Sequence, residues 1–142
     1  MNKTQAISFI KQTAKKYKVK VTFVEFYDCG GSWKPNHVTL NKESNPNFLI
    51  TAFFHELGHQ HCYENNIYKA FHNIDTPNSN KELLAVISTS LKAEKFVDDW
   101  ASKEVLKYFP FFKYKKTYHT DYGKLFLYVY NKRLYNYYFK AL

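Results

Sequence analysis

The sequence is short of cysteine and of long apolar runs, and each shortage excludes a class of protein. Only two cysteines, Cys29 and Cys62, occur among its 142 residues, too few for a disulfide framework. Lys or polar residues interrupt every apolar run before it reaches the roughly 20 residues of a membrane-spanning helix. Residues 1–17 also lack the apolar stretch and cleavage site of a signal peptide. We therefore expect a cytoplasmic protein without a membrane partner.

Acidic residues are also scarce, and the resulting positive charge is unevenly distributed. Twelve acids stand against 21 Lys and Arg, for a net charge of +9. Residues 103–142 carry nine Lys and Arg and two acids, a net charge of +7, and contain nine of the 13 tyrosines. Interleaved basic and aromatic residues could bind nucleic acid or an acidic partner. Because no known nucleic-acid motif accompanies them, we favour a solvated basic surface around an aromatic core.

Aromatic residues are plentiful, at 20% of the chain, and with 45% apolar residues they indicate a folded protein with a substantial core. A chain of this length forms one domain. We expect a single domain over residues 1–142, in which residues 1–108 form the core and residues 109–142 a basic, Tyr-rich extension.

The spacing of apolar residues predicts an α+β fold. Apolar residues near helical spacing predict an opening amphipathic helix from Thr4 to about Tyr17. Alternation then predicts a strand from Val19 to Tyr27, followed by a turn over residues 28–32 and a returning strand over residues 36–40. Together these strands predict a small antiparallel sheet. An exposed strand in this place could pair with an extended peptide.

The next segment predicts a helix with a sharp start. Asn45 is a good N-cap, and Pro46 suits the first helical position, where its missing N–H costs nothing. No further proline interrupts the chain up to about Asn65, and the stretch from residue 48 to residue 54 is largely apolar. We expect a buried helix over residues 46–65.

This helix contains the run H-E-L-G-H at residues 55–59. Residues four apart lie one turn above each other on a helix, so His55 and His59 can aim two imidazole nitrogens at one metal ion. Glu56 would lie beside that ion, where it could accept a proton from an activated water and pass it to a leaving amine. The run therefore predicts zinc on the two histidines and Glu56 as the catalytic base.

A catalytic zinc site usually takes three protein ligands, so a third must come from elsewhere in the chain. From residue 81 to about residue 108 apolar residues recur with helical spacing and no Gly or Pro intervenes, which predicts a long second core helix. Glu94 and Asp98 share the apolar face of this helix, where two carboxylates are unfavourable without cations or donors. We expect Glu94 to bind zinc and Asp98 to accept a hydrogen bond from one of the two histidines.

The run at residues 55–59, followed by E-K-F-V-D-D-W-A at residues 94–101, resembles the gluzincin pattern of HExxH plus a downstream ExxxD. More narrowly it is similar to the ImmA/IrrE-type metallopeptidases, whose second helix tends to read E-x-x-A-[ND]-x-F-A. Glu94, Asp98 and Ala101 match this pattern. Val97 and Trp100 stand where it has alanine and phenylalanine. The resemblance covers roughly residues 5–108 and implies a zincin-like fold. The long interval between the two motifs departs from it, as does the absence of a helix-turn-helix domain.

A different third ligand stays open. His72 lies thirteen residues after His59, a spacing somewhat similar to that of SprT-type proteases, although the His-Gly pair and the zinc ribbon of those proteins are missing. A metzincin is excluded, because Cys62 and Asn65 stand where that class needs Gly and His. Cys62 could approach the metal, but it is better explained as a small buried thiol.

Two further expectations concern a hydrogen-bond donor for the reaction and the position of His61. Peptide hydrolysis benefits from a donor aimed at the tetrahedral intermediate, and a downstream loop offers three candidates, which are Tyr118, His119 and Tyr122. His61 points about 200° away from His59 around the helix, so we expect it at the surface.

These features predict a zinc-dependent endopeptidase that hydrolyses a protein or peptide substrate with metal-activated water. The Lys-, Asn-, Tyr- and Phe-rich composition fits an AT-rich genome and a phage or mobile-element origin, so the protein could act in a bacterial cytoplasm or in a virion. The alternative is a catalytically silent zincin-fold protein with a structural or binding role, for example in a phage assembly. An intact Glu56 favours catalysis, because a structural zinc site needs no base.

Overall fold

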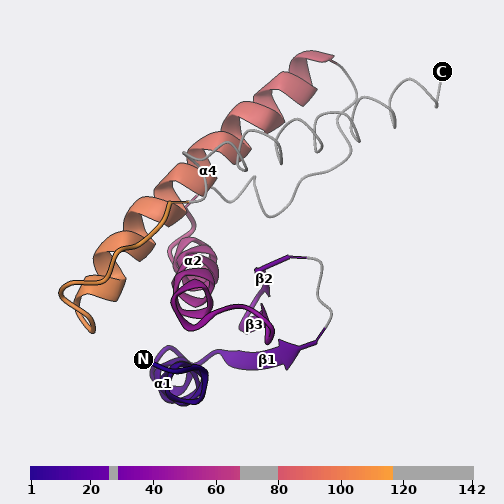
Figure 1. The fold of residues 1–142 in the computed structure, drawn as a ribbon. Helices are drawn as coiled ribbons and strands as arrows, with labels where there is room; N and C mark the ends of the chain where they lie inside the picture. Colours follow the sequence, from indigo (N-terminus) through magenta and orange to yellow (C-terminus); the bar gives the residue numbers. More distant parts are fainter. Residues whose placement is uncertain (26–28, 68–79, 117–142) are drawn as a thin grey trace.

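The computed structural model describes residues 1–25, 29–67 and 80–116, and over residues 80–91 the backbone alone. The described part contains three helices and a three-stranded sheet, in the order α1 (Lys3–Lys16), β1 (Lys20–Val24), β2 (Gly31–Lys34), β3 (His37–Asn41), α2 (Pro46–Glu64) and α4 (Asn80–Leu106). Helix α2 is central, because α1, the sheet and α4 all pack against it (Figure 1). The expected α+β class is confirmed.

The helices begin at residues that cap them. Asn2 and Gln5 form a reciprocal capping box at the start of α1, with hydrogen bonds of 2.8 and 2.9 Å. The side chain of Asn45 accepts from the backbone N–H of Phe48 at 2.9 Å, and Pro46 is the first residue of α2. The helices expected over residues 4–17, 46–65 and 81–108 are all confirmed, to within the usual uncertainty of helix ends.

The sheet differs from the expectation in two ways. Its order is β1-β3-β2, and β3 pairs in parallel with β1 but antiparallel with β2, so the expectation of a purely antiparallel sheet was wrong. Gly31 and Ser32, expected in a turn, instead begin the additional strand β2. Residues 26–28, which end the expected first strand and begin that turn, lie outside the described residues.

A tight turn between β2 and β3 accounts for this topology. Lys34 pairs with His37, which leaves Pro35 and Asn36 as a two-residue connection. Proline holds a negative φ and Asn36 has a φ of 63°, the combination that a type II turn requires. Because this turn reverses the chain once more, β3 runs in the same direction as β1.

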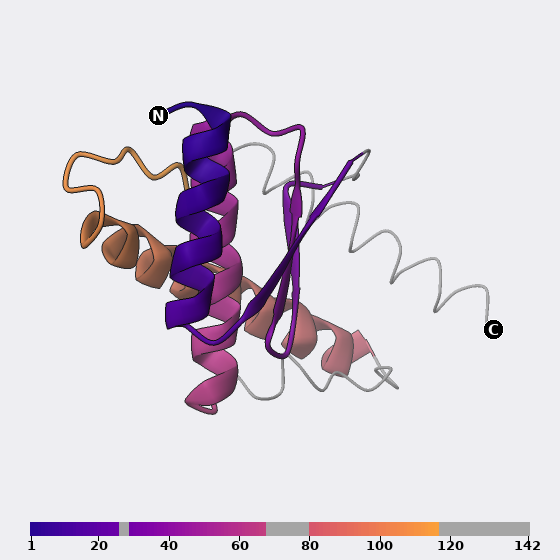
Figure 2. The same ribbon diagram turned by 90° about the horizontal axis from the view of Figure 1, so that it is seen from below.

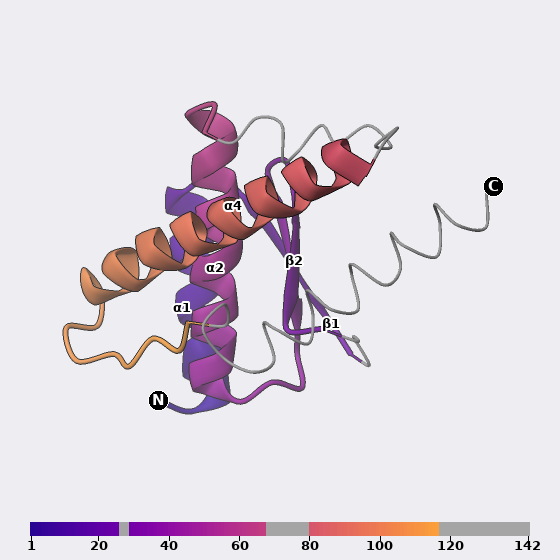
Figure 3. The same ribbon diagram turned by 90° about the horizontal axis from the view of Figure 1, so that it is seen from above.

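The elements form layers around α2. Helices α1 and α2 lie side by side, and α4 crosses α2 on the face opposite α1, as the views from below and above show (Figures 2 and 3). The sheet lies beside α2 and closes the core on a third side. The largest fully buried apolar side chains come from α1, β3, α2 and α4, and include Ile10, Val38, Leu40, Leu49, Ile50, Phe53, Phe54, Leu57, Val97 and Val105. Because α2 is covered on three sides, polar residues in its middle, among them Glu56, His59 and Gln60, are buried as well.

The crossing of α2 and α4 depends on a residue without a side chain. An ideal Cβ at Gly58 would lie 2.7 Å from Cγ1 of Val97 and 3.1 Å from its backbone oxygen. Contacts this short are closer than carbon atoms tolerate, so only glycine allows the two helices to approach to this distance. Val97 lies between Glu94 and Asp98 in the sequence, so the crossing also places those two carboxylates against α2.

One expectation falls largely outside the described residues. Residues 117–142 of the basic extension are not described. None of the helices in the described part of the chain combines the length and apolar character of a bilayer span.

Substitution Gly58→Ala tests the close helix crossing. Alanine is a better helix former than glycine by about 1 kcal/mol, but its methyl group must displace Val97. We expect a net loss of about 1–3 kcal/mol in the free energy of unfolding, the usual cost of overpacking a core, measured by urea denaturation of metal-free protein. Adding Val97→Ala should recover part of the loss, because it removes the nearest carbon atom. A Gly58→Ala variant as stable as the parent would contradict this account.

Candidate metal centre

Two histidines on α2 form one side of the candidate metal centre. His55 and His59 lie one helical turn apart, with ring centroids 5.1 Å apart. Both are largely buried, with 14% of the His55 side chain and 9% of the His59 side chain exposed. The central position of α2 thus removes two polar rings from water, so both rings need polar partners inside the protein.

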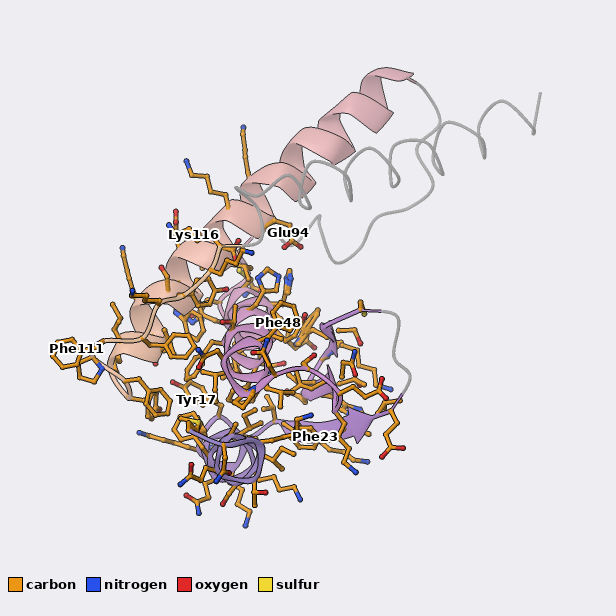
Figure 4. All side chains as sticks on the ribbon, in the orientation of Figure 1. Tyr17, Phe23, Phe48, Glu94, Phe111 and Lys116 are labelled. Atoms are coloured by element: carbon orange, nitrogen blue, oxygen red, sulfur yellow. The ribbon has the colours of Figure 1, made fainter. Side chains whose placement is uncertain are left out.

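Glu94 on α4 completes a three-residue cluster. Its Oε2 atom lies 3.0 Å from Nε2 of His55, and its Oε1 atom lies 3.3 Å from Nε2 of His59. Figure 4 shows the Glu94 side chain on the side of α4 that faces α2. One ligand atom from each of the three residues lies within 4.8 Å of the other two. The expected cluster of His55, His59 and Glu94, which could hold a metal ion, is therefore present.

The donor set fits a zinc-sized ion. A tetrahedral ion about 2.1 Å from each ligand atom holds those atoms about 3.4 Å apart, close to the separations between the Glu94 oxygens and the two rings. Zinc accepts two imidazole nitrogens and a carboxylate oxygen, and other divalent transition metals share that preference. The three residues could therefore hold a transition-metal ion, while the choice of zinc stays a prediction.

Asp98 lies behind His55, away from the cluster. Its carboxylate is fully buried, and its Oδ1 atom lies 2.9 Å from Nδ1 of His55. If Nδ1 carries the proton that Asp98 accepts, Nε2 keeps its lone pair and faces Glu94. In that case Asp98 fixes the tautomer and the direction of the His55 ring, as a metal ligand would require. The expected contact is confirmed, and the structure identifies His55 as the histidine concerned.

Tyr114 is a partner of Asp98 that the sequence did not reveal. Its hydroxyl donates to Oδ1 of Asp98 at 2.7 Å. The two residues are 16 positions apart, on either side of the end of α4. Nine tyrosines over residues 103–142 gave no reason to choose this one, because no periodicity links it to the helix.

Glu56 follows His55 and faces the beginning of β2. Its side chain is buried, and an ideal Cβ on Gly31 would lie 3.1 Å from its Oε1 atom. Burial raises the pKa of Glu56, and the charges of the two histidines oppose that rise. A carboxylate with a raised pKa takes up a proton more readily than a free glutamate, which suits a catalytic base.

The edge of the sheet lies against His59. The Trp33 ring on β2 stacks on the His59 ring, with centroids 6.0 Å apart and planes 28° apart. Gln60 secures this arrangement from α2, because its Oε1 atom accepts from the Trp33 indole at 2.9 Å and from the Asn36 backbone at 2.8 Å. Its amide nitrogen donates to Oδ1 of Asn36 and to Oε1 of Glu64. The sequence predicted neither the stacking of Trp33 on His59 nor the hydrogen bonds of Gln60. Its only signal was a glutamine inside a helix expected to be buried.

The charges of the cluster compensate one another in the metal-free protein. Burial alone would lower the pKa of His55, but its hydrogen bonds to Asp98 and Glu94 raise that pKa well above the ordinary value. Burial would likewise raise the pKa of Glu94, but its hydrogen bonds to His55 and His59 lower it strongly. The raised pKa of His55 favours its protonated form, whose charge offsets part of the negative charge of the buried carboxylates.

The remaining sequence candidates lie apart from the cluster or outside the described residues. Cys62 is buried, and burial raises its pKa to about 11, so the expectation of a small buried thiol is confirmed. His61 was expected at the surface, but it is half-buried and stacks on Trp100 with centroids 4.9 Å apart. The alternative ligand and the three oxyanion candidates are not described: His72, Tyr118, His119 and Tyr122.

No protein-family model matches the chain, and no curated protein or solved structure is detectably similar to it. The resemblance to ImmA/IrrE-type metallopeptidases therefore stays a prediction from the motif residues. Function has to be argued from the chemistry of the cluster itself.

The raised pKa of His55 predicts that metal binding releases a proton. Below that pKa the imidazole is protonated, and its Nε2 must lose the proton to bind a metal. We expect about one proton to be released per zinc ion near pH 6, with the release decreasing as the pH rises through the His55 pKa. Calorimetric titration with zinc in two buffers of different ionisation enthalpy measures this number.

Asp98→Asn provides the control for this experiment. It replaces the carboxylate whose hydrogen bond helps to raise the His55 pKa, so proton release should decline at a lower pH than in the parent. Equal release by the parent and the variant across the whole pH range would contradict the role assigned to Asp98.

Proposed function

We propose that the protein is a zinc-dependent peptidase of the gluzincin type. The observation that carries the proposal is the position of Glu94, which faces Nε2 of both histidines while Asp98 occupies Nδ1 of His55. This arrangement supplies three ligands and leaves further coordination positions to water or substrate, as catalytic zinc sites do and closed structural sites do not. The E-x-x-x-D spacing of the motif resemblance supports the same proposal.

Each residue of the site has a defined task in peptide hydrolysis. A bound zinc ion supplies Lewis acidity, which lowers the pKa of water to about 7 and polarises a carbonyl group. Glu56 accepts a proton from the attacking water as oxygen bonds to the scissile carbonyl carbon. It then delivers that proton to the leaving amine nitrogen as the C–N bond breaks. Burial of Glu56 favours both steps, because its pKa is raised toward the working pH.

The position of β2 supports a peptide as the substrate. This strand is joined to the rest of the sheet through β3. It begins next to Glu56 at Gly31 and carries the Trp33 ring that stacks on His59. An extended peptide that runs along this strand would pass close to the base and the ligands. Because Gly31 has no side chain, the Glu56 carboxylate has room to face such a peptide.

Glu56→Gln tests the catalytic assignment. The variant keeps the shape of the side chain but cannot accept a proton, so zinc content should stay equal to the parent and hydrolysis should fall by about 10²–10⁴-fold. Zinc is measured by elemental analysis, and hydrolysis with a mixture of fluorescence-quenched peptides. The matched control is Glu43→Gln, which makes the same change on an exposed residue and should keep full activity.

The results separate the two functions considered for this chain. Hydrolysis by Glu56→Gln at the parental rate would exclude the proposed mechanism. A parent protein that holds zinc but cleaves none of the peptides would instead support the silent, zincin-fold alternative.

Glu94→Ala tests the third ligand. Loss of a direct ligand should weaken zinc binding by more than the about 10–100-fold that loss of an outer partner costs, as measured by competition with a chromophoric chelator. Glu43→Ala is the control and should bind zinc as the parent does. Unchanged affinity in Glu94→Ala would remove Glu94 from the site and favour His72 in its place.

A further inference from the structure

The chain turns back along α4 after that helix ends, and this returning segment, residues 109–116, is here called the return strap. Pro110 cannot continue the helix, and the Phe109 ring packs on Phe9 of α1 with centroids 4.7 Å apart. The backbone N–H of Phe112 donates to the carbonyl oxygen of Phe109 at 3.0 Å and closes a turn. From there the strap runs back beside α4 toward the metal centre (Figures 1 and 3).

The end of the strap is fixed to two neighbouring carboxylates of α4. Tyr114 donates to Asp98 at 2.7 Å, and Lys116 forms an ion pair with Asp99. Figure 4 shows Lys116 lying against α4, whereas Phe111 at the far end of the strap projects away from the body and is 96% exposed. The strap is therefore held where it meets Asp98, close to the metal centre.

Burying the carboxylate of Asp98 is energetically unfavourable unless it is compensated. Its side chain is fully inaccessible to water, and a buried carboxylate is stable only when several donors surround it. One oxygen atom, Oδ1, accepts from both Nδ1 of His55 and the hydroxyl of Tyr114. The hydroxyl thus fixes the position of the same atom that orients the His55 ring.

The Tyr114 hydroxyl is suited to act as a permanent donor. Burial raises the pKa of Tyr114 strongly, and the negative charge of Asp98 raises it further. The phenol therefore keeps its proton at neutral pH. Its hydrogen bond to Asp98 does not require a proton on Nε2 of His55.

We propose that Tyr114 is a positioning residue of the metal centre, which acts through Oδ1 of Asp98 to hold the His55 ring in the direction that metal binding needs. The inference rests on the proposed function, because it assumes that His55 binds the metal. The return strap is then part of the site although it contributes no ligand. The C-terminal boundary of the functional domain accordingly lies beyond α4.

Tyr114→Phe removes the hydroxyl and keeps the ring. Partners of a metal-bound histidine typically contribute 10–100-fold to metal affinity, and Tyr114 is one contact further out. We expect zinc affinity to fall by about 3–10-fold, measured by chelator competition. The matched control is Tyr108→Phe. Tyr108 also follows the end of α4, and its hydroxyl lies 3.2 Å from that of Tyr17 rather than at Asp98, so this variant should bind zinc as the parent does.

The absorption spectrum of the cobalt-substituted protein provides a readout that a purely structural role would not change. Visible d–d bands report the geometry of the ligands around Co²⁺, so they should shift in Tyr114→Phe and stay unchanged in Tyr108→Phe. Thermal unfolding of the metal-free variants gives the stability effect of each hydroxyl separately. A change in stability with parental zinc affinity and parental spectrum would overturn the inference.

A double-mutant cycle with Asp98→Ala tests the route. If Tyr114 acts through Asp98, then Tyr114→Phe should cause no further loss of zinc affinity once Asp98 is absent. Additive losses would overturn the inference. If Asp98→Ala does not fold, the comparison between the two tyrosine variants decides. A parent that fails to bind zinc would refute the proposed function itself, whereas normal binding by both the parent and Tyr114→Phe would refute this inference alone.

Discussion

The close approach of α2 and α4 is the constraint on which the candidate metal centre depends. The two helices meet where Gly58 leaves room for Val97, with a virtual Cβ only 2.7 Å from a methyl carbon. Because a helix is rigid, fixing Val97 also fixes Glu94 one turn earlier and Asp98 one residue later. The glycine inside the H-E-L-G-H run therefore has a packing role: it allows Glu94 to come within 3.3 Å of both rings.

Buried charge explains why this crossing favours a cation. Glu56, Glu94 and Asp98 surround two histidines, so the cluster has an excess of negative charge whenever both rings are neutral. The metal-free protein reduces this excess by protonating His55, as the raised pKa of that ring indicates. A divalent ion supplies more charge at the same place without a proton, and the ordered ligands repay its loss of hydration. The buried carboxylates thus leave an excess of negative charge that a metal ion could offset.

Local patterns predicted the parts of the site that lie on helices. The cap at Asn45, the four-residue spacing of the histidines and the carboxylates at residues 94 and 98 all follow from helical periodicity. The parallel pairing of β1 with β3 could not be predicted in this way, because it depends on the extra strand β2 and on the turn at Asn36. Tyr114 and Gln60 also escaped prediction, since each is defined by a contact between segments distant in the sequence.

The two histidines are therefore supported by different parts of the chain. His55 is held from the side of α4 and the return strap, through Asp98 and Tyr114. His59 is held from the side of the sheet, where Trp33 stacks on it and Gln60 fixes Trp33. Under the proposed function both rings would bind the metal, so a change in either set of contacts should weaken metal binding. A change in β2 would act through Trp33 and His59, whereas a change in the return strap would act through Asp98 and His55.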